Sequence, residues 1–176
     1  MGYLVDAERD AERIEGLYRQ HAGVARAVAV AITGDPVLAE DLAQDAFIRC
    51  ASRLGTFRDP EKFRSYLLRT IMHLAASHFR RRRIEQRSLQ RLAARPRPEP
   101  PPAQTALTAE LLGGLRSLPI RQRTALTARF LLDWSELDTA EAMGCGVGTV
   151  KSLTSRGLAR LRVTLADREG ADHDGT

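Results

Sequence analysis

The chain has 176 residues, which is enough for one ordinary domain or two small ones and too few for most multidomain enzymes. Its 43% hydrophobic residues argue against global disorder, and the low aromatic content of 5% together with many Ala, Leu and Arg residues predicts an all-α protein. The net charge of +5 is unevenly distributed, because residues 1–61 carry 7 Lys and Arg against 11 Asp and Glu, whereas residues 62–95 carry 10 against 1.

The first predicted helix covers residues 10–33, where Leu17, Val24 and Ile32 keep helical spacing, and Gly34 ends it. Asp35-Pro36 then supplies an N-cap and a proline suited to the first helical position. The second helix is expected to run to Gly55. Its apolar face consists of Leu38, Leu42, Ala46, Cys50 and Leu54.

A third start signal stands at Asp59-Pro60-Glu61. The apolar stripe that follows comprises Phe63, Leu67, Ile71, Leu74, Ala75 and His78, and it runs into the arginines Arg80, Arg81, Arg82 and Arg83. Three helices with interrupting loops predict a small orthogonal or bundle-like domain over residues 1–93.

Residues 94–106 read as a linker, because five of the eight prolines fall at positions 96, 98, 100, 101 and 102. An extended proline-rich segment of this length is long enough to span tens of ångströms between two domains. The sequence therefore predicts two small helical domains joined by a Pro-rich linker.

The second domain is expected over residues 107–165, with helices at 107–116 and 120–132 that break at Leu118-Pro119. Ser135 with Asp138 predicts the start of a short helix that ends near Gly144, and a longer basic helix begins near Val147. The spacing of Ala140, Gly144 and Val150 fits a helix-turn-helix. Residues 166–176 are predicted to be a disordered tail.

The helix from Val147 has one narrow apolar face, formed by Val150, Thr154, Leu158, Leu161 and Leu165. The other side presents short hydroxyls and cations, namely Thr149, Lys151, Ser152, Ser155 and Arg156. A solvated amphipathic helix usually mixes both charge signs, but residues 145–162 contain no acid. This pattern favours contact with DNA bases.

Two further surfaces are less specific. The run Arg80–Arg83 suits phosphate binding, although a solvated helix end or a targeting patch would look the same. The residues Asp41, Gln44, Asp45, Ile48 and Arg49 lie off the apolar stripe of their helix and form an acidic surface with one apolar side chain. Such a surface suits a protein partner better than a nucleic acid.

Enzyme motifs are missing from the sequence. The segment GCGVG follows a helix instead of a strand, and the four histidines have no metal-binding or nucleophile spacing. Cys50 and Cys145 have no CxxC partner, so no zinc site or disulfide framework is indicated. With no apolar run long enough for a membrane span and no signal peptide, we expect a cytoplasmic protein that is not an enzyme and needs no cofactor.

Four segments resemble bacterial sigma factors of the extracytoplasmic function class: AEDLAQDAFIR (39–49), FRSYLLRTIMHLAASHFRRRR (63–83), LPIRQRTALTARFLLDWSELDTAEAMG (118–144) and GVGTVKSLTSRGLARLR (146–162). The resemblance implies sigma region two in the first domain and sigma region four in the second. It also implies core RNA polymerase, through its clamp and flap regions, and promoter DNA as partners, with an anti-sigma factor as a further partner.

By this resemblance, Asp41, Gln44, Asp45, Ile48 and Arg49 would dock on the clamp coiled coil of the largest polymerase subunit. The minus-ten element would be captured and opened by Phe57, Arg58, Lys62, Arg64, Tyr66, Arg69, His73, Arg80, Arg81, Arg82 and Arg83. The minus-thirty-five element would be read by Thr149, Lys151, Ser152, Ser155 and Arg156.

Two other hypotheses fit part of the pattern. A stand-alone helix-turn-helix regulator would bind operators as a dimer and would need only the second domain. A polymerase-binding protein without promoter activity is hinted at by Gly146 and Leu153, where this class commonly has a capping residue and an Arg. The nearly complete first domain favours the sigma factor.

Overall fold

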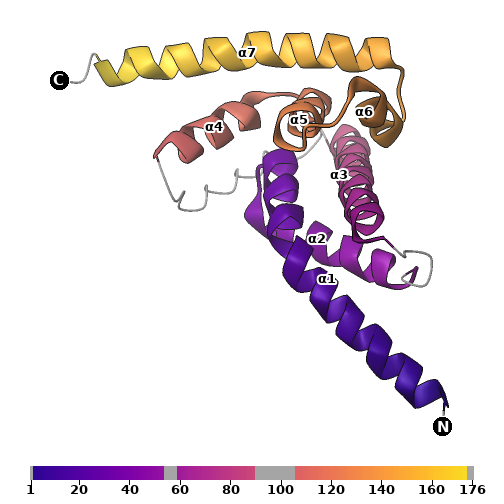
Figure 1. Ribbon diagram of the computed structural model, residues 1–176. Coiled ribbons are helices and arrows are strands. Elements are labelled where there is room, and N and C mark those ends of the chain that lie inside the picture. Colours follow the sequence, from indigo (N-terminus) through magenta and orange to yellow (C-terminus); the bar gives the residue numbers. More distant parts are fainter. Residues whose placement is uncertain (1, 54–58, 90–105, 174–176) are drawn as a thin grey trace.

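The computed structural model describes residues 2–53, 59–89 and 106–173, and within these ranges every regular element is a helix (Figure 1). An N-terminal unit contains α1 (Gly2–Thr33), α2 (Pro36–Ala51) and α3 (Pro60–Leu89). A C-terminal unit contains α4 (Ala106–Ser117), α5 (Ile120–Leu126), the π-helical turn η2 (Thr127–Leu131), α6 (Glu136–Met143) and α7 (Val147–His173). The prediction of an all-α protein is confirmed.

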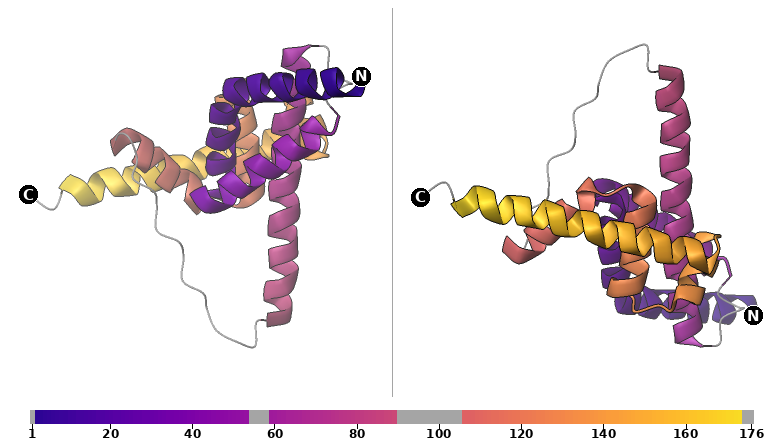
Figure 2. Two further views of the ribbon diagram at one scale, coloured as in Figure 1. Left: turned by 90° about the horizontal axis from the view of Figure 1, so that it is seen from below. Right: turned by 90° about the horizontal axis from the view of Figure 1, so that it is seen from above.

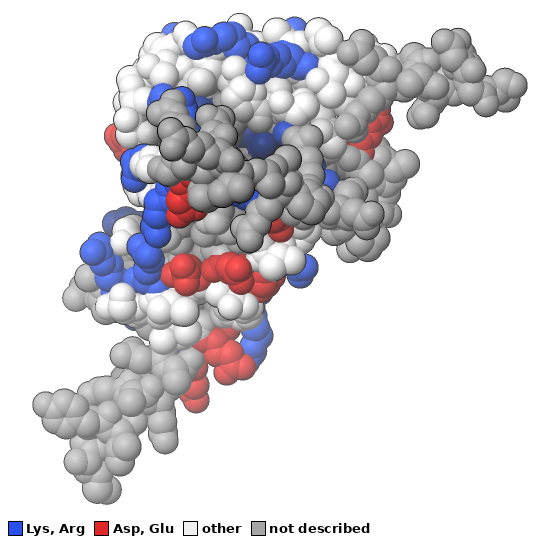
Figure 3. Space-filling view, turned by 180° about the vertical axis from the view of Figure 1, so that it is seen from behind, with Lys and Arg blue, Asp and Glu red and all other residues white. Residues whose placement is uncertain are grey.

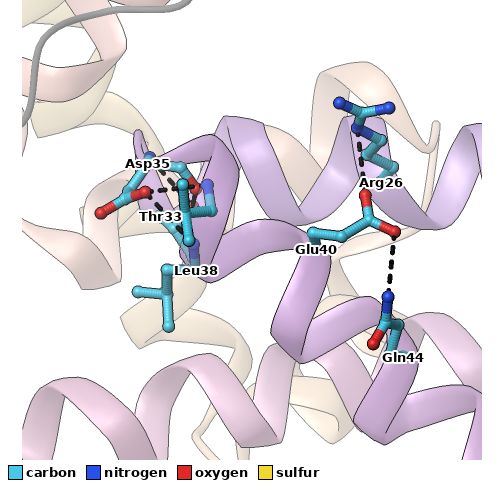
Figure 4. Close-up of polar contacts among 7 residues, drawn as sticks. Arg26, Thr33, Asp35, Leu38, Glu40 and Gln44 are labelled. Atoms are coloured by element: carbon cyan, nitrogen blue, oxygen red, sulfur yellow. Dashed lines mark hydrogen bonds and ion pairs between the residues drawn. The ribbon is translucent and has the colours of Figure 1, made fainter.

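The junction between α1 and α2 follows the local sequence signals. Gly34 has a φ of +70°, a left-handed conformation that favours glycine, and it ends α1. The Asp35 carboxylate then accepts hydrogen bonds from the backbone N–H groups of Val37 and Leu38, at 3.0 and 3.2 Å (Figure 4). The expected N-cap is confirmed. However, α1 begins at Gly2 instead of residue 10, because residues 2–9 contain no proline and extend a helix that is already formed.

The core of the N-terminal unit lies where α1, α2 and α3 pack together. The predicted stripe on α3 is buried from Phe63, which is 2% exposed, to Ala75. Leu42, Ala46 and Cys50 of α2 are buried as expected, but α2 ends at Ala51. The predicted end at Gly55 and the last stripe residue, Leu54, lie outside the described residues.

The C-terminal unit contains the expected helix-turn-helix in α6 and α7. The Ser135 hydroxyl accepts a hydrogen bond from the backbone N–H of Asp138 at 3.0 Å, and Gly144 ends α6 with a φ of +59°. Ala140 and Val150 are buried where the two helices meet. Helix α7 also crosses α5 closely at Gly157, where an added Cβ would lie 3.1 Å from Leu126 Cδ1.

Two details of this unit differ from the expectation. The helix predicted over 120–132 changes into a π-helical turn after Leu126, because the Leu132 N–H bonds to the Thr127 carbonyl five residues back, at 3.1 Å. Residues 166–173 continue α7 instead of forming a disordered tail. Helix α7 is anchored by Leu161 and Leu165, which pack over Gly114 of α4, and extending a helix that is already formed costs less than starting one.

The two units share one hydrophobic cluster. Ala128, Leu132 and Ala142 of the C-terminal unit are buried together with core residues of α1, α2 and α3, and Trp134 packs against the same cluster. Helix α7 lies across the top of the molecule in Figure 1. Figure 2 shows that the C-terminal half of α3 projects away from this body.

Candidate nucleic-acid and polymerase interfaces

A polar hollow of about 370 Å³ lies between the end of α2 and one face of α3. Its lining includes Arg49, Arg53, Tyr66, His73 and Arg81. The Arg53 guanidinium carbon lies 5.7 Å from the centre of the Tyr66 ring, which is a cation–π contact. Proteins bind single-stranded nucleic acid with two kinds of side chain placed next to each other. Cations contact the phosphates, and aromatic rings stack on the bases.

The hollow combines residues that were predicted to belong to two different binding surfaces. It brings Tyr66, His73 and Arg81 together, all three of which the sequence assigns to the minus-ten element. It also includes Arg49, which the sequence assigns to the polymerase surface. The sequence-based prediction missed four further residues that line the hollow, namely Ser52, Arg53, Thr70 and Ser77. Their only signal in the sequence is a helical position next to Arg49 or Tyr66.

The run Arg80–Arg83 is exposed along the projecting part of α3. Four adjacent arginines cover more than one turn of the helix, so their positive charge is spread around it, which suits the phosphates of a nucleic acid. Lys62 is exposed and Arg64 is half-buried near the start of the same helix. Phe57 and Arg58 lie outside the described residues.

Arg69, which the resemblance assigns to the minus-ten element, is half-buried and is paired with carboxylates of the C-terminal unit. Its Nη2 atom is 3.4 Å from Glu141 Oε2 and 4.0 Å from Asp138 Oδ1, and both carboxylates belong to α6. Its guanidinium carbon lies 5.9 Å from the centre of the Trp134 ring. The C-terminal unit therefore engages this predicted minus-ten residue, an arrangement that the spacing along α3 cannot indicate.

The predicted reading face of α7 is exposed over Thr149, Lys151, Ser152, Ser155 and Arg156. In Figure 3 the Lys and Arg side chains form a group along the top of the molecule, where α7 lies. Ser152 Oγ donates to the Gly148 carbonyl at 3.0 Å, and Arg156 Nε donates to the Ser152 carbonyl at 3.1 Å. The two side chains are thus held along the first turns of the helix.

The apolar face of α7 differs in detail from the expected one. Val150, Leu153 and Gly157 are buried, whereas Thr154 and Leu158 are only half-buried. Leu153 is 8% exposed, so it packs inside the C-terminal unit and could not contact a phosphate. Packing therefore explains why a leucine stands at this position, and Leu153 gives no sign of lost promoter activity.

The acidic surface of α2 is exposed at all five predicted residues, namely Asp41, Gln44, Asp45, Ile48 and Arg49. Ile48 has 68% of its surface exposed, which leaves an apolar side chain open on the acidic surface. The neighbouring Glu40 is used internally: it pairs with Arg26 of α1 at 3.3 Å and accepts a hydrogen bond from Gln44 at 3.5 Å (Figure 4). Among the described residues, no ion pair involves Asp41 or Asp45.

Two buried titratable groups belong to the core. Burial raises the pKa of the Cys50 thiol to about 11, which keeps it protonated at neutral pH. Burial also lowers the pKa of His21, and the nearby Arg64 guanidinium lowers it further, against a smaller opposing effect of Glu61. The His21 ring stacks on Phe63, with the ring centres 5.8 Å apart.

We expect the lowered pKa of His21 to make the protein less stable in mild acid. An unfolded His takes up its proton near pH 6.5, whereas the folded His21 does so only at lower pH, so protonation favours the unfolded state. The free energy of unfolding should fall as the pH drops below about 6.5, and it should stop falling below the pKa of the folded His21. Urea unfolding between pH 7.5 and 5.5 measures this slope. A His21→Leu variant should lose part of it, and an unchanged slope would contradict the prediction.

The part of the chain that the structure describes contains no group of three or more His, Cys, Asp and Glu able to hold a metal ion. In the same residues, no helix is both long and apolar enough to cross a membrane.

A helix-turn-helix beside a second helical domain with its own cationic surface defines a DNA-binding protein of the transcription machinery. Two family models match the chain: sigma-70 region 2 over residues 17–84 and sigma-70 region 4 over residues 108–161. The chain belongs to the sigma-70 family, within its extracytoplasmic function class. It is a sigma factor, which binds core RNA polymerase and directs it to promoters, and the operator-binding regulator is not favoured.

Relatives and solved structures agree with this family assignment. The RNA polymerase sigma-E factor of Streptomyces coelicolor is 35% identical over 135 residues, which are 77% of this chain and 76% of that protein. The sigma factor SigC of Mycobacterium tuberculosis is 32% identical over 83% of this chain and 78% of its own length. In the solved structures, the sigma factor RpoE bound to the anti-sigma factor NepR from Bartonella quintana shares the fold, with a TM-score of 0.72, 24% identity, and coverage of 88% of this chain and 98% of that one.

Proposed function

We propose that the three surfaces divide the work of promoter recognition: the acidic surface of α2 docks on the polymerase clamp, α3 holds the opened minus-ten element, and α7 reads the minus-thirty-five element. The observation that carries this proposal is the hollow between α2 and α3, which Arg49, Arg53 and Arg81 line together with Tyr66. The protein would act in the cytoplasm and would catalyse no reaction itself.

The acidic surface suits a basic partner with an apolar contact point. Asp41 and Asp45 are exposed without ion pairs among the described residues, and Ile48 stands between them and Arg49 along the helix. Complementary charges orient such a complex, while an exposed apolar side chain gains free energy when it is covered.

The hollow suits one or two unpaired nucleotides. Opening a duplex costs base stacking, and this cost falls when the freed bases stack on aromatic rings and the phosphates meet cations. Tyr66 supplies the ring, and Arg49, Arg53 and Arg81, which line the same hollow, supply positive charge. The projecting run Arg80–Arg83 extends the same positive surface toward the neighbouring duplex.

The start of α7 suits a DNA major groove. It presents the short side chains of Thr149, Ser152 and Ser155 between two cations, Lys151 and Arg156. A groove admits a helix whose reading face carries small polar groups, and the cations fix its register on the phosphates.

Binding and transcription assays test the proposal together. The full chain, added to bacterial core RNA polymerase, should form a stable complex and produce transcripts from a subset of genomic promoter fragments. Failure to bind core polymerase would overturn the proposal. A stable dimer that shifts duplex DNA without polymerase would instead support the operator-binding regulator.

An anti-sigma factor is a further proposed partner. The similar solved structures include RpoE in complex with the anti-sigma factor NepR, and CnrH in complex with the cytosolic domain of CnrY. For this chain the supporting feature is that its exposed acidic and cationic surfaces remain accessible to a protein that would mask them.

A further inference from the structure

The cationic side chains of this protein are almost all arginines. Of the 27 Lys and Arg residues, only two are lysines, namely Lys62 and Lys151. The two residue types differ chemically, because a guanidinium group stays protonated in proteins, whereas a lysine amine can lose its proton and then attack an acyl group. A reagent directed at side-chain amines can therefore change the charge of this chain at two positions only.

Both lysines lie on the surfaces proposed to bind promoter DNA. Lys62 is exposed in the first turn of α3, and Lys151 is exposed near the start of α7, on the predicted reading face. The acidic surface of α2 contains no lysine. The cations that line the hollow beside α3 are also not lysines but Arg49, Arg53 and Arg81. The reactive amines are thus confined to the proposed DNA contacts and absent from the proposed polymerase contact.

The two amines have different surroundings. Lys151 Nζ lies 3.5 Å from Glu136 Oε2 of α6, and the two side chains are 63% and 39% exposed. Among the described residues, no ion pair involves Lys62. Acylation of Lys151 has to break an ion pair, whereas acylation of Lys62 does not. We therefore expect Lys62 to react before Lys151.

Acylation of Lys151 would change the reading face of α7 by more than the loss of one cation. The ammonium group becomes a neutral amide, and Glu136 loses the cation that it pairs with. Glu136 is half-buried close to the start of α7, so its carboxylate would then repel a phosphate that approaches this end of the helix. Arg156 would remain as a cation of the same face.

We propose that Lys62 and Lys151 are acylation sites, at which an acyl phosphate weakens DNA binding and leaves polymerase binding unchanged. In the reaction the ammonium group first gives a proton to solvent, and the amine nitrogen then forms a bond to the acyl carbon. The bond between this carbon and the phosphate oxygen breaks, and inorganic phosphate leaves with the second proton. The effect on DNA binding rests on the proposed function, whereas the reactivity of the two amines does not.

Treatment of the full chain with acetyl phosphate tests the two sites. After removal of the reagent, mass spectrometry of peptides should locate acetyl groups on Lys62 and Lys151, with Lys62 modified faster. A chain that carries no acetyl group on either lysine after treatment would overturn the proposal. The matched variant is Lys62→Arg/Lys151→Arg, which keeps both positive charges but has no side-chain amine to acylate.

Binding to a labelled DNA duplex of about 30 base pairs and mixed sequence tests the consequence, because contacts to phosphates do not depend on sequence. Treatment should weaken the binding of the wild type about three- to tenfold and reduce its dependence on salt. The affinity of the double Arg variant should be the same before and after treatment. An equal loss in both proteins, or no loss in the acetylated wild type, would overturn the proposal.

Binding of the same samples to core RNA polymerase separates this proposal from the proposed function. The acetylated wild type should bind core polymerase as tightly as the untreated chain, and a selective loss of polymerase binding after acetylation would overturn the proposal. If the untreated chain does not bind core polymerase, the proposed function fails. The acetylation sites and the duplex affinities are still measured in that case, so the two failures are distinguishable.

Discussion

Replacing Phe63 by Ala is expected to cost about 3–5 kcal/mol of stability. The Phe63 side chain is 2% exposed, and its ring lies 5.8 Å from that of His21 and 6.2 Å from that of Phe47, measured between ring centres. Its removal leaves a cavity at the point where all three helices of the N-terminal unit meet. Because small domains have about 5–15 kcal/mol of stability in total, the N-terminal unit should be close to unfolding.

Chemical unfolding followed by circular dichroism measures this loss. The matched control is Phe79→Ala on the same helix, where the half-buried ring contacts His78 edge-to-face at 5.5 Å but lies beyond the core cluster. We expect the control to cost much less than Phe63→Ala. Equal costs for the two variants would mean that Phe63 does not occupy the centre of the core.

The sequence predicts the helices because their signals are local. Asp35, Gly34, Ser135 and Gly144 each act within one turn of their own helix, so the caps and stops fall where the residues indicate. The same holds for the predicted reading face of α7, whose five residues are exposed, although periodicity does not predict the burial of Leu153 and Gly157 on the other side. Local sequence signals are enough to predict both the helix ends and the exposed residues of this face.

Contacts between the two units could not be predicted in this way. Periodicity shows that a helix face is buried, but it does not show which other helix covers it. The engagement of Arg69 by α6 depends on Trp134, and Trp134 reaches α3 only because a π-helical turn and the left-handed Asp133 redirect the chain. Neither feature has a recognised sequence signal in this segment.

The hollow beside α3 shows that helical periodicity also fails to predict contacts between helices within one unit. Arg49 lies four residues after Asp45, so helical spacing assigns both to one face of α2. The structure leaves Asp45 on the exposed acidic surface, while Arg49, which is also exposed, lines the hollow near Tyr66. A long side chain at the end of a helix can serve a neighbouring surface, and only the packing of α2 on α3 decides which one.

Asp45→Arg is expected to weaken binding to core RNA polymerase by at least tenfold and to reduce promoter-directed transcription in proportion. Asp45 is exposed, has no ion pair among the described residues, and lies beside the exposed Ile48. Reversing its charge turns attraction to a basic partner into repulsion, which costs several kcal/mol at a close contact. Folding should be unaffected, since an exposed substitution of this kind changes stability by about 0.5 kcal/mol or less.

Titration of labelled core polymerase with each variant measures the effect, and Glu12→Arg is the matched control because it makes the same charge change at an exposed residue of α1. The control should bind like the wild type. If both variants lose affinity equally, net charge and not the α2 surface governs docking. If Asp45→Arg binds normally but initiates poorly, the surface acts after docking. Only a selective loss of binding in Asp45→Arg, with an unchanged circular dichroism spectrum, supports the clamp-docking role of α2.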